Sequence, residues 1–199
     1  MSSVNESEKR IFIHIPRCAG TSMERVNWNR GDFHQTIYFF KNKKGIDIDN
    51  YFKWCFVRNP WDRTHSVYNF VRKLNSEVSF EYFIKALYKE KDKLQVQNIT
   101  HKEILLPVLN LPVTKIHFFP MVSLISIDNE IKMDFIGRYE NLEQDWKTIT
   151  EILKQPPTPL MHINQGRNKP YYKNDYTKEL IDMVEEIYEK DIKAFNYTF

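Results

Sequence analysis

The chain of 199 residues contains little cysteine, little glycine and no long hydrophobic run. Its 2 cysteines, Cys18 and Cys55, cannot form a disulfide framework, and no Cys/His spacing matches a zinc site. With only 5 glycines and 42% hydrophobic residues, the composition excludes a fibrous or disordered protein. These counts predict one reduced globular domain that folds without a disulfide or a structural metal.

The apolar runs and the charge balance exclude two further classes. The longest apolar runs, at 11–15 and 121–127, are far shorter than the roughly 20 residues of a membrane span. The polar start of the chain is not expected to be a signal peptide, so the sequence predicts a cytoplasmic protein. The 29 basic and 26 acidic residues are interspersed, giving a net charge of +3. We therefore expect no nucleic-acid partner, while a local cationic pocket for a small anion remains compatible.

Strand-like segments alternate with amphipathic segments after a polar stretch at 1–10. The pattern predicts strands or strand pieces at 11–15, 52–58, 115–119, 122–127 and 134–138. It predicts helices beginning at Thr21 or Ser22 and at 60–72, 80–91, 142–154 and 175–194. This order indicates a single α/β domain with a mostly parallel central sheet flanked by helices. Ligands bind at the carboxyl ends of such strands, which directs attention to 16–22 and 58–66.

The first of these loops, Pro16–Ser22, has the chemistry of an anion site. A loop that enters a helix presents unpaired N–H groups at the positive end of the helix dipole, which favours phosphate or sulfate. Arg17 adds a positive charge, and Thr21 and Ser22 add hydroxyl donors. No lysine stands between Gly20 and Thr21, so the loop is not a Walker A motif. The alternative is an ordinary strand-to-helix turn.

The second loop supplies a second possible cation. Arg58 follows the strand at 52–58 and is expected to point into the same crevice, with Ser66 about two helical turns further on. Together they could bind a second anion, the arginine through bidentate hydrogen bonds. The alternative is that Arg58 pairs with Asp62 and steadies the turn.

At these two segments the chain resembles a known family. The stretches IFIHIPRCAGTSME (11–24) and FVRNPWDRTHSVYNF (56–70) are similar to the two cofactor motifs of sulfotransferases that use 3′-phosphoadenosine-5′-phosphosulfate (PAPS). The similarity is greatest to the branch of carbohydrate sulfotransferases and their bacterial relatives, which 135–146, 161–172 and 187–197 also resemble. The resemblance implies a P-loop-like sulfotransferase domain over 11–199 that works without a metal.

The resemblance also implies a role for individual residues. The first loop would cradle the 5′-phosphosulfate of PAPS, and Arg58 with Ser66 would bind the 3′-phosphate. Arg17, at a position where many members carry lysine, would also act in catalysis by neutralising charge on the departing phosphate. The implied cofactor-binding residues are Arg17, Cys18, Ala19, Gly20, Thr21, Ser22, Arg58, Ser66, Arg167 and Lys169.

A hydroxyl acceptor needs a base, and His34 is the candidate because relatives have a similarly placed histidine. Asp32 is an alternative base or a residue that orients His34, which could also be an ordinary surface histidine. His14 is expected in the core, and His65 is expected to face away from the acceptor. Cys18, beside Arg17 at a helix start, is expected to have a lowered thiol pKa but no partner base.

The acceptor and two rival functions stay open on sequence grounds. The resemblance favours a hydroxyl, or an amine, on a carbohydrate or glycolipid, with a small metabolite as the alternative. One rival is a P-loop phosphotransferase in which 124–128 would be a Walker B strand. The other is a binding protein that holds the nucleotide without turnover, for which His34 is the discriminating residue.

Overall fold

The computed structural model describes residues 2–24, 34–42, 44–74, 76–99, 115–156 and 171–199. The strands are β1 (Ser3–Asn5), β2 (Arg10–Ile13), β3 (Phe52–Val57), β4 (Ser126–Ile127), β5 (Glu130–Ile131) and β6 (Phe135–Arg138). The α-helices are α1 (Gly20–Glu24), α2 (Ile37–Asn42), α3 (Pro60–Leu74), α4 (Phe80–Lys89), α5 (Lys91–Leu94), α6 (Met121–Ile125), α7 (Leu142–Ile152), α8 (Lys178–Ile187) and α9 (Glu189–Phe195). Short 3₁₀ helices are η1 (Ile48–Asn50), η3 (Lys115–His117), η4 (Tyr139–Asn141) and η5 (Tyr171–Asp175).

The central sheet has the strand order β1-β2-β3-β6. The two inner pairings, β2 with β3 and β3 with β6, are parallel, which confirms the predicted mostly parallel α/β sheet. β1 pairs antiparallel with β2 at the edge, so part of the polar segment 1–10 joins the sheet. An antiparallel strand at the edge can contain polar residues, because only one of its faces has to pack against the core.

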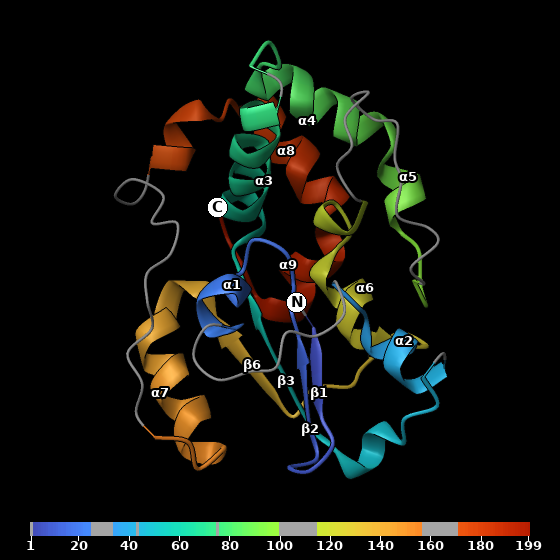
Figure 1. The fold of residues 1–199 in the computed structure, drawn as a ribbon. Helices are drawn as coiled ribbons and strands as arrows, with labels where there is room; N and C mark the ends of the chain where they lie inside the picture. Colours follow the sequence, from blue (N-terminus) through green and yellow to red (C-terminus); the bar gives the residue numbers. More distant parts are fainter. Residues whose placement is uncertain (1, 25–33, 43, 75, 100–114, 157–170) are drawn as a thin grey trace.

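Helices cover the sheet and continue above it. On one face, Trp54 of β3 packs against Phe12 of β2 and, with ring centroids 6.4 Å apart, against Trp146 of α7. In Figure 1 the sheet fills the lower half of the molecule, while α3, α4 and α8 form a helical layer beyond the carboxyl ends of the strands. The site is therefore expected at the boundary between sheet and helical layer.

The segment before β6 differs from the prediction of strand pieces at 115–119 and 122–127. It forms η3 and α6 instead, and only Ser126–Ile127 is a strand. Pro120 precedes α6, and the buried carboxylate of Asp191 accepts hydrogen bonds from the first two N–H groups of α6, at 2.8 Å each. This cap comes from α9, about seventy residues away, so local sequence pattern could not reveal it.

The same segment removes the basis for a Walker B strand. Residues 124–128 pass from α6 into the β4–β5 hairpin and not into the central sheet. Asp128 and Asn129 form its turn with φ of 51° and 65°, as the hairpin requires. The helix predicted at 175–194 is likewise divided into α8 and α9, at Tyr188.

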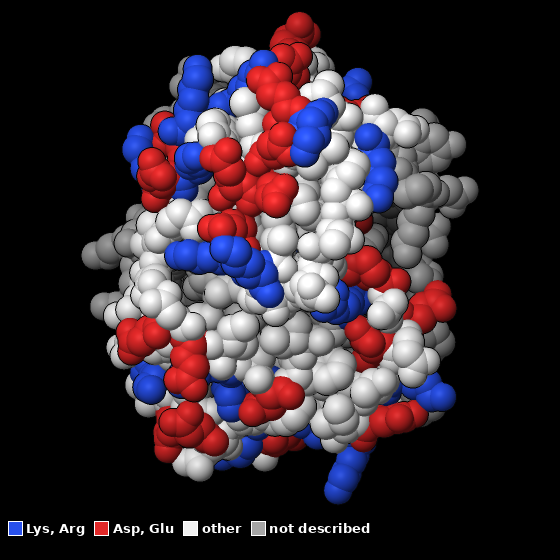
Figure 2. Space-filling view, turned by 180° about the vertical axis from the view of Figure 1, so that it is seen from behind, with Lys and Arg blue, Asp and Glu red and all other residues white. Residues whose placement is uncertain are grey.

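The described helices and the visible surface agree with the composition. None of the helices in the described ranges is long and apolar enough to cross a membrane. Figure 2 shows acidic and basic side chains intermixed on the rear face, with no broad area of one sign. On this face, a cationic site would therefore have to be local.

Candidate active site

The carboxyl ends of three parallel strands meet at one edge of the sheet. β2, β3 and β6 end at Ile13, Val57 and Arg138; Val57 pairs with Arg138, and Ile13 pairs with Cys55, two residues before the end of β3. The loops that follow carry Arg17, Arg58 and the Tyr139–Asn141 turn. This edge is where ligands bind in open α/β sheets.

The loop after β2 has the backbone conformation of an anion site. Arg17 and Ala19 are left-handed, with φ of 68° and 65°. The N–H groups of Cys18 and Ser22 donate to carbonyls of the loop itself. Among the described residues, the N–H groups of residues 19–21 have no acceptor. A turn with several free N–H groups forms a concavity that binds anions.

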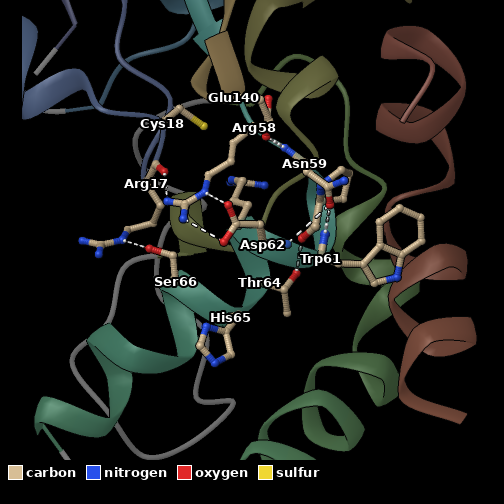
Figure 3. Close-up of polar contacts among 12 residues, drawn as sticks. Arg17, Cys18, Arg58, Asn59, Trp61, Asp62, Thr64, His65, Ser66 and Glu140 are labelled. Atoms are coloured by element: carbon tan, nitrogen blue, oxygen red, sulfur yellow. Dashed lines mark hydrogen bonds and ion pairs between the residues drawn. The ribbon is translucent and has the colours of Figure 1, made fainter. Parts of the chain in front are cut away.

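Arg17 adds a positive charge to this loop, and the described residues contain no ion-pair partner for it. Its Nε donates to Ser66 Oγ at 3.1 Å, and its guanidinium lies over the ring of Phe70, 5.6 Å from the centroid (Figure 3). Burial and the neighbouring Arg58 guanidinium lower the pKa of Arg17. No carboxylate in the described ranges lies within ion-pair distance of it. An anion bound here would relieve the repulsion between the two guanidiniums.

Arg58 pairs with Asp62, as the alternative interpretation expected. Its Nε and Nη2 each lie 2.8 Å from a different oxygen of the Asp62 carboxylate, and Nη1 donates to the Arg17 carbonyl at 3.0 Å (Figure 3). The ring of Tyr139 covers the guanidinium, with 3.9 Å between centroid and Cζ. Burial lowers the pKa of Arg58, but Asp62 outweighs burial and the net shift is upward. Among the described residues, three of its five N–H donors are used, and the other two have no partner there.

Arg58 and Ser66, which were expected to bind a second anion together, do not contact each other in the described hydrogen bonds. Ser66 contacts Arg17 instead, so the hydroxyl joins the first loop to α3. A joint role of Arg58 and Ser66 at a 3′-phosphate stays a prediction.

The third strand end contributes residues that the sequence analysis did not assign to the site. Glu140 Oε1 accepts the Asn59 N–H at 2.6 Å, and its Oε2 accepts the hydroxyl of Tyr197 at 3.0 Å. Glu140 therefore ties the β6 loop to the start of α3. The rule that singled out the first two loops, carboxyl ends of parallel strands, also selects Tyr139 and Glu140 once β6 is recognised as their neighbour.

His34 lies beside the first loop with one tautomer imposed. Its Nδ1 is 3.1 Å from the His14 carbonyl oxygen. Because a carbonyl oxygen can only accept, Nδ1 carries the proton and Nε2 keeps a lone pair. Burial lowers the pKa of His34 to about 4, so the imidazole is neutral near pH 7. This is the protonation state that a general base requires.

Two further histidines pack against His34. Ring centroids are 4.4 Å apart for His14 and 5.5 Å apart for His117. His14 is buried, as predicted, and burial also lowers its pKa well below 6.5. His117, on η3, carried no signal in the sequence, because its position depends on the unpredicted helical segment.

The remaining predicted residues fall into two groups. His65 Nε2 lies 2.7 Å from Asp175 Oδ2, and Figure 3 shows its ring directed away from the two arginines. That His65 faces away from the acceptor stays a prediction. Asp32, Arg167 and Lys169 lie outside the described residues. Their predicted roles therefore stay predictions.

The prediction of a lowered pKa for Cys18 is wrong. The side chain is buried, with Sγ 3.8 Å from Met121 Sδ, and burial raises its pKa to about 12. The thiol points into the core, while the backbone of Cys18 is part of the loop. Desolvation here outweighs the nearby guanidiniums, so a nucleophilic role is not supported.

Gly20 is required by close packing and gives a first testable prediction. A Cβ on Gly20 would lie 2.1 Å from His14 Cδ2, and the buried His14 ring has little room to move. We expect Gly20→Ala to lower the free energy of unfolding by about 2 kcal/mol in urea titrations. In a His14→Ala background the same change should cost much less, because the ring is gone. An equal cost in both backgrounds would contradict the assigned contact.

The lowered pKa of His34 predicts an acid-dependent loss of stability. A pKa below that of the unfolded chain means that the unfolded chain binds more protons between pH 6.5 and about 4. The contribution is complete above pH 6.5 and is lost as pH falls toward 4, by up to about 3 kcal/mol. Asp191, whose pKa burial raises to about 6, acts in the opposite direction as pH rises.

A comparison with His34→Asn isolates the histidine contribution. Asparagine keeps a donor for the His14 carbonyl but does not titrate. The unfolding free energy of the His34→Asn variant should vary less between pH 4 and 6.5 than that of the unmodified chain. Asp191 is present in both proteins, so its contribution cancels in the difference. Parallel curves for the two proteins would show that His34 is not buried as a neutral imidazole.

No group of three or more His, Cys, Asp or Glu side chains in the described part of the chain is placed to hold a metal ion. The described strand ends carry the guanidiniums of Arg17 and Arg58 and free N–H groups, and the neutral His34 imidazole lies against His14 and His117. Such a site can bind a polyanion and deprotonate a neighbouring hydroxyl.

Comparison with known proteins gives this chemistry a family. Carbohydrate sulfotransferase 14 of Danio rerio is 24% identical over 204 residues, covering 89% of this chain and 53% of the relative. Carbohydrate sulfotransferase 9 of Homo sapiens is 23% identical over 232 residues, covering 98% and 52%. An uncharacterized protein of Archaeoglobus fulgidus is 26% identical over 139 residues, covering 68% and 96%.

The chain thus spans about half the length of the two carbohydrate sulfotransferases. The sequence pattern of the sulfotransferase family matches residues 2–198, which include all three strand ends of the site. The family match, the mostly parallel α/β sheet and the donor groups at the strand ends are consistent with one another. The chain belongs to the sulfotransferase family.

Proposed function

We propose that the protein transfers the sulfuryl group of PAPS to a hydroxyl group of a carbohydrate, with an amine as the other possible nucleophile. The observation that carries the proposal is the charge of Arg17, without an ion-pair partner among the described residues, on a loop whose N–H groups at 19–21 have no acceptor there. A P-loop phosphotransferase with a Walker A motif would need a lysine in this loop, which has none.

The described donors fit the two anionic ends of PAPS, which as donor substrate supplies the sulfuryl group. Arg17 and the N–H groups of residues 19–21 would bind the 5′-phosphosulfate and neutralise charge that develops on the leaving phosphate. The two unused N–H donors of Arg58 would bind the 3′-phosphate, with Ser66 at its edge. Arg167 and Lys169 would add positive charge, as the family resemblance implies.

His34 would act as the general base. Its Nδ1–H is held by the His14 carbonyl, which directs the lone pair of Nε2 to the acceptor hydroxyl. Its neutral state near pH 7 favours proton acceptance, although the low pKa makes it a weak base. Loss of the hydroxyl proton is then expected to accompany sulfuryl transfer, rather than to precede it.

The carbohydrate acceptor is inferred from the two carbohydrate sulfotransferases to which the chain is similar. The test is transfer from radiolabelled PAPS to a panel of oligosaccharides, with phenols and small alcohols in parallel. Labelled carbohydrate would support the proposal. Labelling of small alcohols alone would replace the acceptor class, and labelling of none would contradict the proposed activity.

A further inference from the structure

Arg63 is a buried arginine whose role the activity proposed above does not explain. It lies on α3 and is 2% exposed. Its guanidinium donates to three backbone carbonyls: Nε to Pro16 at 3.2 Å, Nη1 to Phe119 at 3.0 Å and Nη2 to His117 at 3.2 Å. In the described ranges no carboxylate lies within ion-pair distance of it. The Tyr188 ring, 5.8 Å from Cζ, and the buried Asp191 carboxylate also interact with this charge. A buried cation is costly unless it is well satisfied, so the geometry of these contacts is tightly defined.

These carbonyls belong to the two segments that form the site. Pro16 begins the anion-binding loop, and the next carbonyl, that of Arg17, accepts from Arg58 at 3.0 Å. Arg58, which precedes α3, and Arg63 on α3 therefore fix the peptides on both sides of Arg17. That residue has a φ of 68°, which a non-glycine residue adopts only where its surroundings hold it.

The other two carbonyls lie on the segment that presents His117 to His34. His117 and Phe119 flank the end of η3, and the His117 ring is 5.5 Å from that of His34. Asp191 caps α6, which follows this segment, and its buried carboxylate interacts with the Arg63 charge. Arg63 is the element that connects this segment with the loop.

We propose that Arg63 is a positioning residue that couples the Pro16–Gly20 loop to the His117–Phe119 segment, and so fixes the donor loop relative to the His34–His117 pair. Its effect on the donor rests on the proposed function, whereas the coupling of the two segments does not. Arg63 touches neither reacting group; it acts through the backbone of both segments.

Variants of Arg63 are compared with variants of Arg10. Arg10 also donates to a backbone carbonyl, that of Leu153 at 2.6 Å, but it lies at the amino end of β2, away from the site. Lysine keeps the charge of either residue but cannot reach three carbonyls at once. Arg63→Lys and Arg10→Lys therefore form a matched pair, with Arg63→Gln as a second variant.

The first measurement is amide hydrogen exchange without ligand. Arg63→Lys should accelerate exchange in both 14–22 and 115–120, and Arg10→Lys in neither. Acceleration of one segment alone, or of none, would overturn the coupling. This measurement decides the coupling even if the protein binds no nucleotide, an outcome that would instead count against the proposed function.

The second measurement is calorimetric binding of 3′-phosphoadenosine-5′-phosphate. Arg63→Lys should raise the Kd about tenfold, because the loop is no longer held in its binding conformation. Arg10→Lys should bind like the unmodified protein even where its Tm falls comparably. Unchanged affinity of Arg63→Lys would show that Arg63 only supports the fold.

If neither Arg63 variant folds, the unmodified chain still gives a decision. Bisphosphate binding at the loop should then slow exchange at 115–120 as well as at 14–22. Protection confined to 14–22 would overturn the proposal.

Discussion

Arg17→Met is expected to lower kcat/KM by about 10²–10³-fold, because it removes the charge that would stabilise the leaving phosphate. Methionine has a similar length and keeps contact with Phe70, but it makes no hydrogen bond to Ser66. The Tm should stay the same or rise, since the substitution removes repulsion between Arg17 and Arg58. Steady-state kinetics with varied PAPS and thermal unfolding give the two readouts.

Arg17→Lys is the matched control for this prediction. Lysine keeps the charge and stands at this position in many members that the chain resembles, so we expect activity within about tenfold of the unmodified protein. If Arg17→Met kept its activity, or lost it only together with its fold, Arg17 would have no role in catalysis.

His34→Asn is expected to lower kcat by about 10²–10⁴-fold while leaving bisphosphate affinity unchanged. Asparagine preserves the donor to the His14 carbonyl and removes only the basic Nε2. In the unmodified enzyme the acid limb of kcat/KM should lie near pH 4 and not near 6.5, following the pKa of His34. Kinetics across pH 4–8 measure both effects.

Two controls separate His34 from other candidates. His65→Asn should leave kcat nearly unchanged, because His65 pairs with Asp175 away from the site. Asp32→Asn should have a smaller effect than His34→Asn. If His34→Asn bound the bisphosphate normally and turned over at the normal rate, or if Asp32→Asn had the larger effect, the assignment of the base would be wrong.

The sheet could be predicted because its strands are encoded locally. The runs at 11–15 and 52–58 are short and apolar. Asn59-Pro60 predicts a helix that begins at Pro60, which is where α3 begins. The structure of the segment 115–127 could not be predicted, because its apolar residues fit a strand as well as a helix. The carboxylate of Asp191, remote in sequence, decides for α6.

The site was predictable to the extent that it follows strand ends. The loops of Arg17 and Arg58 meet at one edge of the sheet, and His34 contacts His14, the residue after β2. The roles of these residues in the reaction stay predictions. Burial was not readable from the same motifs. It reverses the predicted shift of the Cys18 pKa. It also buries Arg63, which lies inside the second motif but had no predicted role, where it links two segments.

The central claim, that the strand-end loops bind a 3′,5′-bisphosphorylated nucleotide, is tested most directly by thermal unfolding with 3′-phosphoadenosine-5′-phosphate beside ATP with magnesium. At a hundredfold excess over Kd the bisphosphate should add about 2.7 kcal/mol of stability. For a chain of this size that raises Tm by roughly 5–10 °C. A rise with the bisphosphate alone is the result that the account predicts; a rise only with ATP and magnesium, or none with either, would contradict it.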